Sequence, residues 1–314
     1  MIHKIEEPAE IGHARTALTR TEVQFYDTFG FLILRNHFTQ DEMKAISDEF
    51  EYAVELEFKD KPFEKDLPTS ERAQCLSFTD STTPLLVALA EDPRYYKIAE
   101  QLLSGEIIGA QGGGCLYVGD TRWHPDRVPD GRYKTAVIDK PKEYSRYSNH
   151  NFGCKFALYL EAVDADTGAL RVLPRSHRQP LYGELRKIPG ITDAENVRSL
   201  PGFVCATEPG DVLIFNHSCW HASLGGKSGR PMIAAGYYAY PRTEDQAQEL
   251  RETYMHSKIL SKDYSKEGKE TEPLSEWNQN PNQSPLRAKW IEYKREFGYF
   301  DYKSGSLEEE LKAP

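Results

Sequence analysis

Long apolar runs are missing from this sequence of 314 residues, and PLLVALA at 84–90 is among the longest. A helix that crosses a membrane needs about 20 apolar residues, so no segment qualifies. The opening residues MIHKIEEPAE also lack the apolar core of a secretory signal peptide. We therefore expect a cytoplasmic protein with no membrane partner.

Clusters of positive charge are also missing, since no Lys/Arg block is sustained and the formal net charge is −10. Nucleic acid is therefore not expected as a partner. Cysteine is scarce as well, and its five positions are scattered and never spaced as CxxC. This pattern excludes a disulfide framework and a zinc knuckle, and it predicts small buried side chains in a reducing compartment. The five are Cys75, Cys115, Cys154, Cys205 and Cys219.

Internal repeats and low-complexity segments are absent too, and no linker divides the chain. A β core commonly forms one domain in a chain of this length. We predict a single domain over 1–314, with a mainly helical part at 1–105, a β core at 106–241 and a helical cover at 242–314.

The first hundred residues predict helices with one early strand. Thr19 and Glu22 have the spacing of a capping box, which marks the start of an amphipathic helix. Gly30 then separates this helix from a short apolar run. The expected elements are a helix through about Thr28, a strand at 31–35, and further helices at 39–57 and 91–104.

From about residue 107 onward, short β-forming runs alternate with turn residues. Along CKFALYLEAVD, the side chains of Phe156, Leu158, Leu160 and Ala162 share one face. The turns DADTG and Pro209-Gly210 predict two hairpins, one joining 154–164 to 169–174 and the other joining 202–208 to 211–216. A further strand is expected at 231–240. Short strands in this number predict a sandwich or barrel of the jelly-roll kind.

The triplet H-P-D places an imidazole and a carboxylate at positions i and i+2. In an extended segment, His124 and Asp126 therefore point to one face. A third ligand is expected from a distant strand, and His221 follows the apolar run DVLIFN. Two histidines and one carboxylate form the facial triad of non-haem Fe(II) oxygenases, which leaves coordination positions open. A bidentate 2-oxo acid and dioxygen would fit these positions.

Arg230 begins the next predicted strand, across a Gly-rich loop from His221. Its guanidinium can hold the far carboxylate of 2-oxoglutarate in a bidentate pair. Ser223 lies two residues after His221 on the same face and can donate its hydroxyl to that carboxylate. Arg122 shares a face with His124, and it either contacts the oxo-acid end of the cosubstrate or pairs with a carboxylate at the surface.

Several other residues have competing interpretations. His217 is an alternative third ligand, because it lies four residues before His221. If His221 is the ligand, His217 is expected to be a hydrogen-bonded residue near the site. His177 is expected to be a structural turn residue. Gly168 and Pro174 are expected to punctuate a hairpin without a chemical role.

Together these pieces resemble the phytanoyl-CoA dioxygenase-like family of Fe(II)- and 2-oxoglutarate-dependent oxygenases. The matching segments are FYDTFGFLILRNHF, WHPD, DADTGALRVLPRSHR, PGDVLIFNHSCWHAS and the arginine of GRPMIAAGYY. The resemblance implies a double-stranded β-helix core, and it favours His221 over His217 because the family pattern ends in Trp-His. It implies iron ligands His124, Asp126 and His221, with Arg230 and Ser223 on 2-oxoglutarate. The loop from His221 to Arg230 is somewhat shorter than in some members.

The resemblance also implies an enzyme that uses Fe(II), 2-oxoglutarate and O2 to hydroxylate a C–H bond of a small metabolite or natural-product intermediate, with release of succinate and CO2. Family members that halogenate have a small residue in place of the carboxylate ligand, so Asp126 favours hydroxylation. Desaturation, epoxidation or ring closure is the alternative.

A non-catalytic jelly roll with a structural metal is a rival interpretation. The presence of Arg230 and Ser223 argues against it, because a structural metal would not need them. A zinc hydrolase lacks an obvious additional general base.

Residues 127–152 form an unusually long connection after the first two ligands, and such connections are often active-site lids. The segment contains proline and glycine residues, which interrupt regular secondary structure, together with several Lys, Arg and Tyr side chains. We therefore predict a lid that excludes water and favours a small, polar substrate. Neither the identity of that substrate nor the oligomeric state follows from the sequence.

Overall fold

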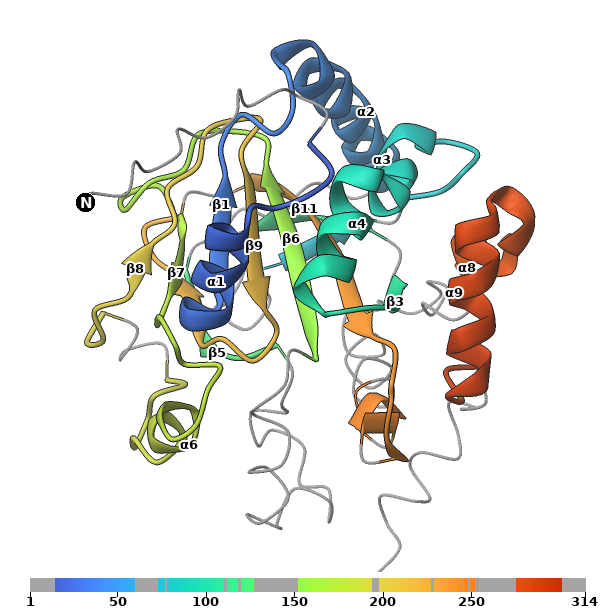
Figure 1. The fold of residues 1–314 in the computed structure, drawn as a ribbon. Helices are drawn as coiled ribbons and strands as arrows, with labels where there is room; N and C mark the ends of the chain where they lie inside the picture. Colours follow the sequence, from blue (N-terminus) through green and yellow to red (C-terminus); the bar gives the residue numbers. More distant parts are fainter. Residues whose placement is uncertain are drawn as a thin grey trace, which may run out of the picture.

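The computed structural model describes residues 15–59, 73–76, 78–109, 112–117, 120–126, 152–193, 198–226, 229–244, 246–247, 249–251, 253 and 275–300. Two antiparallel β-sheets pack against each other, and helices cover the outer face of the larger one (Figure 1). The predicted fold class, a mainly β jelly roll with flanking helices, is confirmed. In the described part of the chain, no helix combines the length and the apolar character that a membrane crossing requires.

Among the described residues, the larger sheet has seven strands, six of them in the order β1-β9-β6-β11-β4-β2, with β3 paired to β11. Their bounds are β1 (Phe31–Leu34), β2 (Ala73–Leu76), β3 (Ile107–Gly109), β4 (Gly113–Tyr117), β6 (Gly153–Tyr159), β9 (Val212–Asn216) and β11 (Arg230–Ala239). The sequence predicted β1 but not β2. Both strands precede residue 106 and still belong to this sheet, so the helical part and the β core share hydrogen bonds.

The smaller sheet, in the part of the chain that the structure describes, has four strands in the order β5-β10-β7-β8. Their bounds are β5 (Thr121–His124), β7 (Leu170–Val172), β8 (Phe203–Val204) and β10 (His221–Ser223). Side chains of the two sheets meet in one apolar cluster, which includes Tyr159, Phe215 and Met232 of the larger sheet and Leu170 and Val172 of the smaller one. The candidate site lies between the sheets, beside this cluster.

The two predicted hairpins are wrong, because consecutive strands here change sheets. β6 pairs with β9 and β11, whereas β7 pairs with β8 and β10. In the same way, β8 belongs to the smaller sheet and β9 to the larger one. A turn such as 164–168 reverses the chain equally well within a sheet and across a sandwich, so its sequence does not separate the two outcomes.

Most helices pack on the outer face of the larger sheet (Figure 1). There Phe156 and Leu158 of β6 join a cluster with residues such as Ile98 and Trp290, which confirms the predicted alternation along β6. The bounds are α1 (Arg20–Phe29), α2 (Gln40–Phe58), α3 (Pro84–Ala88), η1 (Leu89–Glu91), α4 (Pro93–Leu102), α8 (Glu276–Gln279), η4 (Pro281–Gln283) and α9 (Pro285–Glu296), with α6 (Leu181–Arg186) beside the smaller sheet.

The first helix begins and ends as its sequence predicts. The Thr19 hydroxyl accepts a hydrogen bond from the Glu22 backbone N–H, and the Glu22 carboxylate accepts one from the Thr19 backbone. Gly30 ends the helix with a φ of 84°, a left-handed conformation that glycine adopts without strain. β1 follows at once and hydrogen-bonds to β9, the strand that leads to His221.

Candidate metal centre

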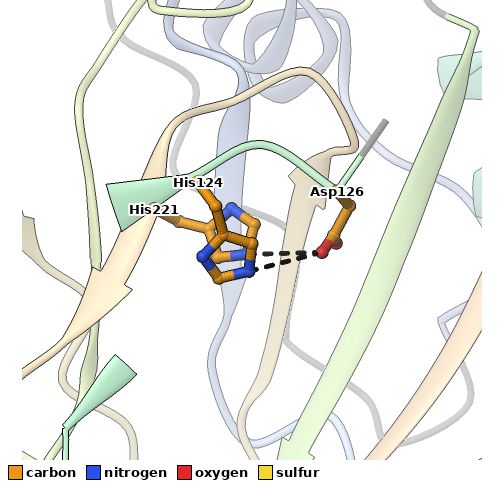
Figure 2. A group of neighbouring side chains, drawn as sticks. All are labelled: His124, Asp126 and His221. Carbon is orange, nitrogen blue, oxygen red and sulfur yellow. Dashed lines mark ion pairs between the residues drawn. The ribbon is translucent and has the colours of Figure 1, made fainter. Parts of the chain in front are cut away.

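The three predicted ligands lie together at one end of the smaller sheet (Figure 2). His124 of β5 and His221 of β10 are direct cross-strand partners, and their ring centroids are 4.3 Å apart. Asp126 follows β5 and turns its carboxylate toward both rings. One nitrogen or oxygen atom from each residue lies within 4.8 Å of the others. Antiparallel pairing of two distant segments thus builds the group.

Backbone carbonyls fix the orientation of both imidazoles. His124 Nδ1 lies 2.7 Å from the Arg122 carbonyl oxygen, and His221 Nδ1 lies 2.9 Å from that of Cys219. Because a carbonyl oxygen can only accept, each Nδ1 carries the proton and donates it. A neutral ring then has a lone pair at Nε2. His221 Nε2 lies 3.5 Å from Asp126 Oδ1, and His124 Nε2 lies 3.8 Å from the same atom.

Electrostatics keep His124 and Asp126 in the protonation states that a metal needs. Burial, followed by the neighbouring His221 ring, lowers the pKa of His124 to about 4, so this imidazole is neutral near pH 7. Burial by itself would raise the pKa of Asp126, but Lys155 and His221 hold it well below its usual range. Two nitrogen lone pairs and a carboxylate oxygen therefore converge, and this donor set suits a divalent first-row transition metal.

A second polar group lies farther along β10. The buried guanidinium of Arg230 donates from Nη2 to the Ser223 hydroxyl at 3.2 Å. The Ser223 hydroxyl also lies 3.0 Å from that of Thr121 on β5. The structure thus brings Arg230 and Ser223 together, as the sequence predicts, and it adds Thr121. A buried guanidinium beside hydroxyl groups is an arrangement that can bind a carboxylate.

Gly168 lies in the predicted turn, and it also packs against Arg230. Its φ is 93°, and a Cβ placed there would lie 1.9 Å from Arg230 Nη1 and 2.6 Å from the Cα of Gly226. No side chain fits between these atoms. The turn after β6 therefore needs glycine so that the guanidinium can lie against the backbone.

Thr121, rather than Arg122, lies opposite Ser223 because β5 contains an irregularity. His221 pairs with His124 and Ser223 pairs with Thr121, so one extra residue is inserted on β5. Such a bulge changes which side chains share a face. Arg122 contributes its carbonyl oxygen to His124. Binding of the cosubstrate by the Arg122 side chain stays a prediction.

The other histidines of the motif region lie outside the group. His217 is buried beside the Tyr238 ring, with a centroid distance of 5.0 Å, and an added Cβ at Gly153 would meet its Nδ1 at 2.7 Å. His177 is buried near α1, where its Nε2 lies 3.2 Å from the carbonyl oxygen of Asp27. The second position agrees with the predicted structural role.

Sequence reasoning missed the part that Lys155 has in the site. Its Nζ lies 2.7 Å from Asp126 Oδ2. The sequence feature that could have revealed this role is that Lys155 is the charged residue of β6. The residues after it pack alternately on the two faces of the sheet. The predicted lid at 127–152 lies outside the described residues except for Phe152, which is buried.

Comparisons with known proteins identify a family and several similar sequences. The family described as Phytanoyl-CoA dioxygenase (PhyH) matches residues 26–233. The "Ectoine dioxygenase" proteins of Bordetella bronchiseptica and Bordetella parapertussis are each 25% identical over 187 residues, which is 55% of this chain and 55% of theirs. The chain thus spans about half the length of these curated relatives.

A likeness to solved structures supports the fold. HygX from Streptomyces hygroscopicus, crystallised with nickel and 2-oxoglutarate, superposes with a TM-score of 0.52 at 18% identity, over 71% of this chain and 87% of HygX. Its iron-bound form gives a TM-score of 0.50 at the same identity and coverage. The family match covers more than half of the sequence and includes the two histidines, the aspartate, Ser223 and Arg230. This chain belongs to the phytanoyl-CoA dioxygenase (PhyH) family.

Proposed function

We propose that this protein is an Fe(II)- and 2-oxoglutarate-dependent oxygenase that hydroxylates a C–H bond of a small, polar metabolite. The observation that carries the proposal is the convergence of three metal-binding atoms next to a buried arginine with a hydroxyl partner. His124, Asp126 and His221 would hold the iron. Membership of the PhyH family supports this assignment, as does the dioxygenase activity named for its curated relatives.

The spacing between the two polar groups suits 2-oxoglutarate. Ser223 is two residues beyond His221 on β10, so the groups are separated by roughly 7 Å along the strand. A five-carbon diacid can bridge such a gap with its oxo-acid end beside the triad and its far carboxylate on Arg230. Between these levels the larger sheet pairs Ala157 with Ala234, so the side chains at this point are small.

The residues of the chain have separate tasks in this reaction. When bound, the iron supplies the activation of dioxygen that oxidation of a C–H bond requires. His124, Asp126 and His221 would hold the iron and would leave other coordination positions free for the cosubstrate and dioxygen. Arg230 neutralises the far carboxylate, and the two packed sheets exclude water from the interior. Asp126 fills a coordination position that a halide would otherwise need, which favours hydroxylation.

Succinate formation tests the proposal. Purified protein with Fe(II), ascorbate and O2 should slowly convert 2-oxoglutarate to succinate, and a library of small metabolites should contain one that accelerates this conversion. Asp126→Gly should lose the reaction, because the metal loses one of its three ligands. Full activity in that variant would show that Asp126 is not a ligand. Metal binding without any effect of 2-oxoglutarate would favour a non-catalytic jelly roll.

A further inference from the structure

The two carboxylate oxygens of Asp126 face different partners. Oδ1 lies on the side of the imidazoles, 3.5 Å from His221 Nε2 and 3.8 Å from His124 Nε2. Oδ2 lies 2.7 Å from the Lys155 ammonium. One oxygen is thus directed at the site where the imidazole lone pairs converge, and the other is engaged by a cation from the opposite sheet.

Lys155 is held in this position by its neighbours on the larger sheet. On β6 it lies between Phe215 of β9 and Gly236 of β11. The Phe215 ring lies 5.9 Å from the Lys155 Nζ and 4.8 Å from the His221 ring, so one aromatic side chain supports both groups. Gly236 leaves the other side open, since a Cβ there would meet only the His217 ring at 3.8 Å.

The number of oxygens that Asp126 offers decides how many coordination positions remain. An octahedral metal with two histidines and one carboxylate oxygen keeps three open positions. A bidentate carboxylate would leave only two, and a chelating 2-oxo acid would then occupy both. Dioxygen would have no position in that arrangement. Chemistry of this class therefore needs an aspartate that binds through a single oxygen.

We propose that Lys155 is a positioning residue that binds Oδ2 of Asp126 and so restricts this carboxylate to metal binding through Oδ1. The inference rests on the proposed function, because it concerns the same iron site. Partners of metal ligands commonly fix ligand orientation in this way. Lys155 is not itself placed on the metal or on 2-oxoglutarate.

Substitution of Lys155 tests the inference with readouts other than turnover. Lys155→Met keeps the length of the side chain but removes the cation. In crystals of the Mn(II)-loaded protein, we expect one Asp126 oxygen on the metal in the wild type and both oxygens in Lys155→Met. In anaerobic solution with Fe(II), the charge-transfer band that reports 2-oxoglutarate chelation should need about tenfold more cosubstrate in the Met variant. Fe(II) affinity itself should not fall.

Two controls separate the cation from the fold. Lys155→Arg retains a cation near Oδ2 and should restore binding through one oxygen. Lys187→Met removes an exposed lysine that is also 2.7 Å from its carboxylate partner, Glu184, and it should change nothing at the metal.

The outcomes are distinguishable. If Lys155→Met keeps Asp126 on Mn(II) through Oδ1 alone, with wild-type affinity for 2-oxoglutarate, the inference is wrong and the proposed function stands. If Lys155→Arg behaves like Lys155→Met, the inference is also overturned, because a cation does not restore the site. If the wild type binds neither Fe(II) nor 2-oxoglutarate, both the inference and the proposed function are overturned.

Discussion

Two regions of this molecule hold polar and charged side chains in opposite arrangements. On the helical side of the larger sheet, Arg287 of α9 donates to both oxygens of Asp80, at 2.6 and 2.9 Å, and to Glu91 at 2.6 Å. We call these three residues the α9 cluster. In the candidate metal centre, by contrast, three acceptor atoms of His124, Asp126 and His221 point toward one another.

This difference separates a stabilising cluster from a binding site. In the α9 cluster the guanidinium, whose side chain is only 2% exposed, lies against two carboxylates, so the chain supplies both signs of charge itself. In the metal centre each imidazole donates its Nδ1 proton to a backbone carbonyl oxygen, so its Nε2 lone pair faces the other ligands. Acceptor atoms do not stabilise one another when their lone pairs converge. A bound metal cation would stabilise all three.

Removal of Arg287 should have the largest effect on stability. Arg287→Met leaves Asp80 and Glu91, whose side chains are 10% and 13% exposed, without an opposite charge. Breaking a buried pair costs about 3–5 kcal/mol in the free energy of unfolding, and we expect a loss near the lower end of that range here. Chemical denaturation measures this cost, and metal binding by the folded variant should be unchanged. Lys289→Met, which removes an exposed ion pair with Glu106 from the same helix, should cost less than about 1 kcal/mol. Equal losses of unfolding free energy in Arg287→Met and Lys289→Met would contradict the stabilising role assigned to the α9 cluster.

Substitution of Arg230, unlike that of Arg287, should act mainly on ligand binding. It should weaken the binding of 2-oxoglutarate strongly and change iron binding little. Removing a buried guanidinium from a carboxylate costs about 2–4 kcal/mol, so Arg230→Ala should weaken 2-oxoglutarate binding by tens- to hundreds-fold. Anaerobic titration of the Fe(II)-loaded protein measures this affinity. Iron content should barely change, because Arg230 is not among the three converging groups. An unaltered affinity would assign the carboxylate contact to another residue.

A smaller effect is expected from the glycine that packs against this arginine. In Gly168→Ala, the new methyl group would meet both the Arg230 guanidinium and the Cα of Gly226, so both must shift. We expect about a tenfold loss of 2-oxoglutarate affinity, or about 1.4 kcal/mol, in the folded variant. Gly113→Ala is the matched control, because a Cβ there would approach only the Leu76 carbonyl oxygen, at 4.0 Å. If both variants bind 2-oxoglutarate like the wild type, the guanidinium does not depend on Gly168.

Patterns within short segments predicted most of the centre. The i, i+2 spacing of His124 and Asp126 is a property of an extended chain, and the motifs around His221 and Arg230 carried the rest. The capping box of α1 and the alternation along β6 are equally local, and both are confirmed. Each of these features depends only on residues that are close together in the chain, so a short stretch of sequence is enough to predict it.

Features that depend on pairing between distant segments were missed. Lys155 meets Asp126 across the two sheets, and Thr121 reaches Ser223 only because β5 has an extra residue. The two hairpins failed for the same reason: the turn at 164–168 has the same sequence whether β7 returns to the sheet of β6 or crosses to the other one. Sheet membership is decided by tertiary packing, which no turn motif encodes.

The iron content of two histidine variants tests the central claim most directly. His221→Ala and His217→Ala each remove a buried imidazole from the same short segment, but only His221 presents its Nε2 to Asp126. After anaerobic reconstitution with Fe(II) and desalting, the wild type and His217→Ala should each retain about one iron per chain, and His221→Ala should retain almost none. Iron retained by His221→Ala and lost from His217→Ala would contradict the assignment of the metal centre.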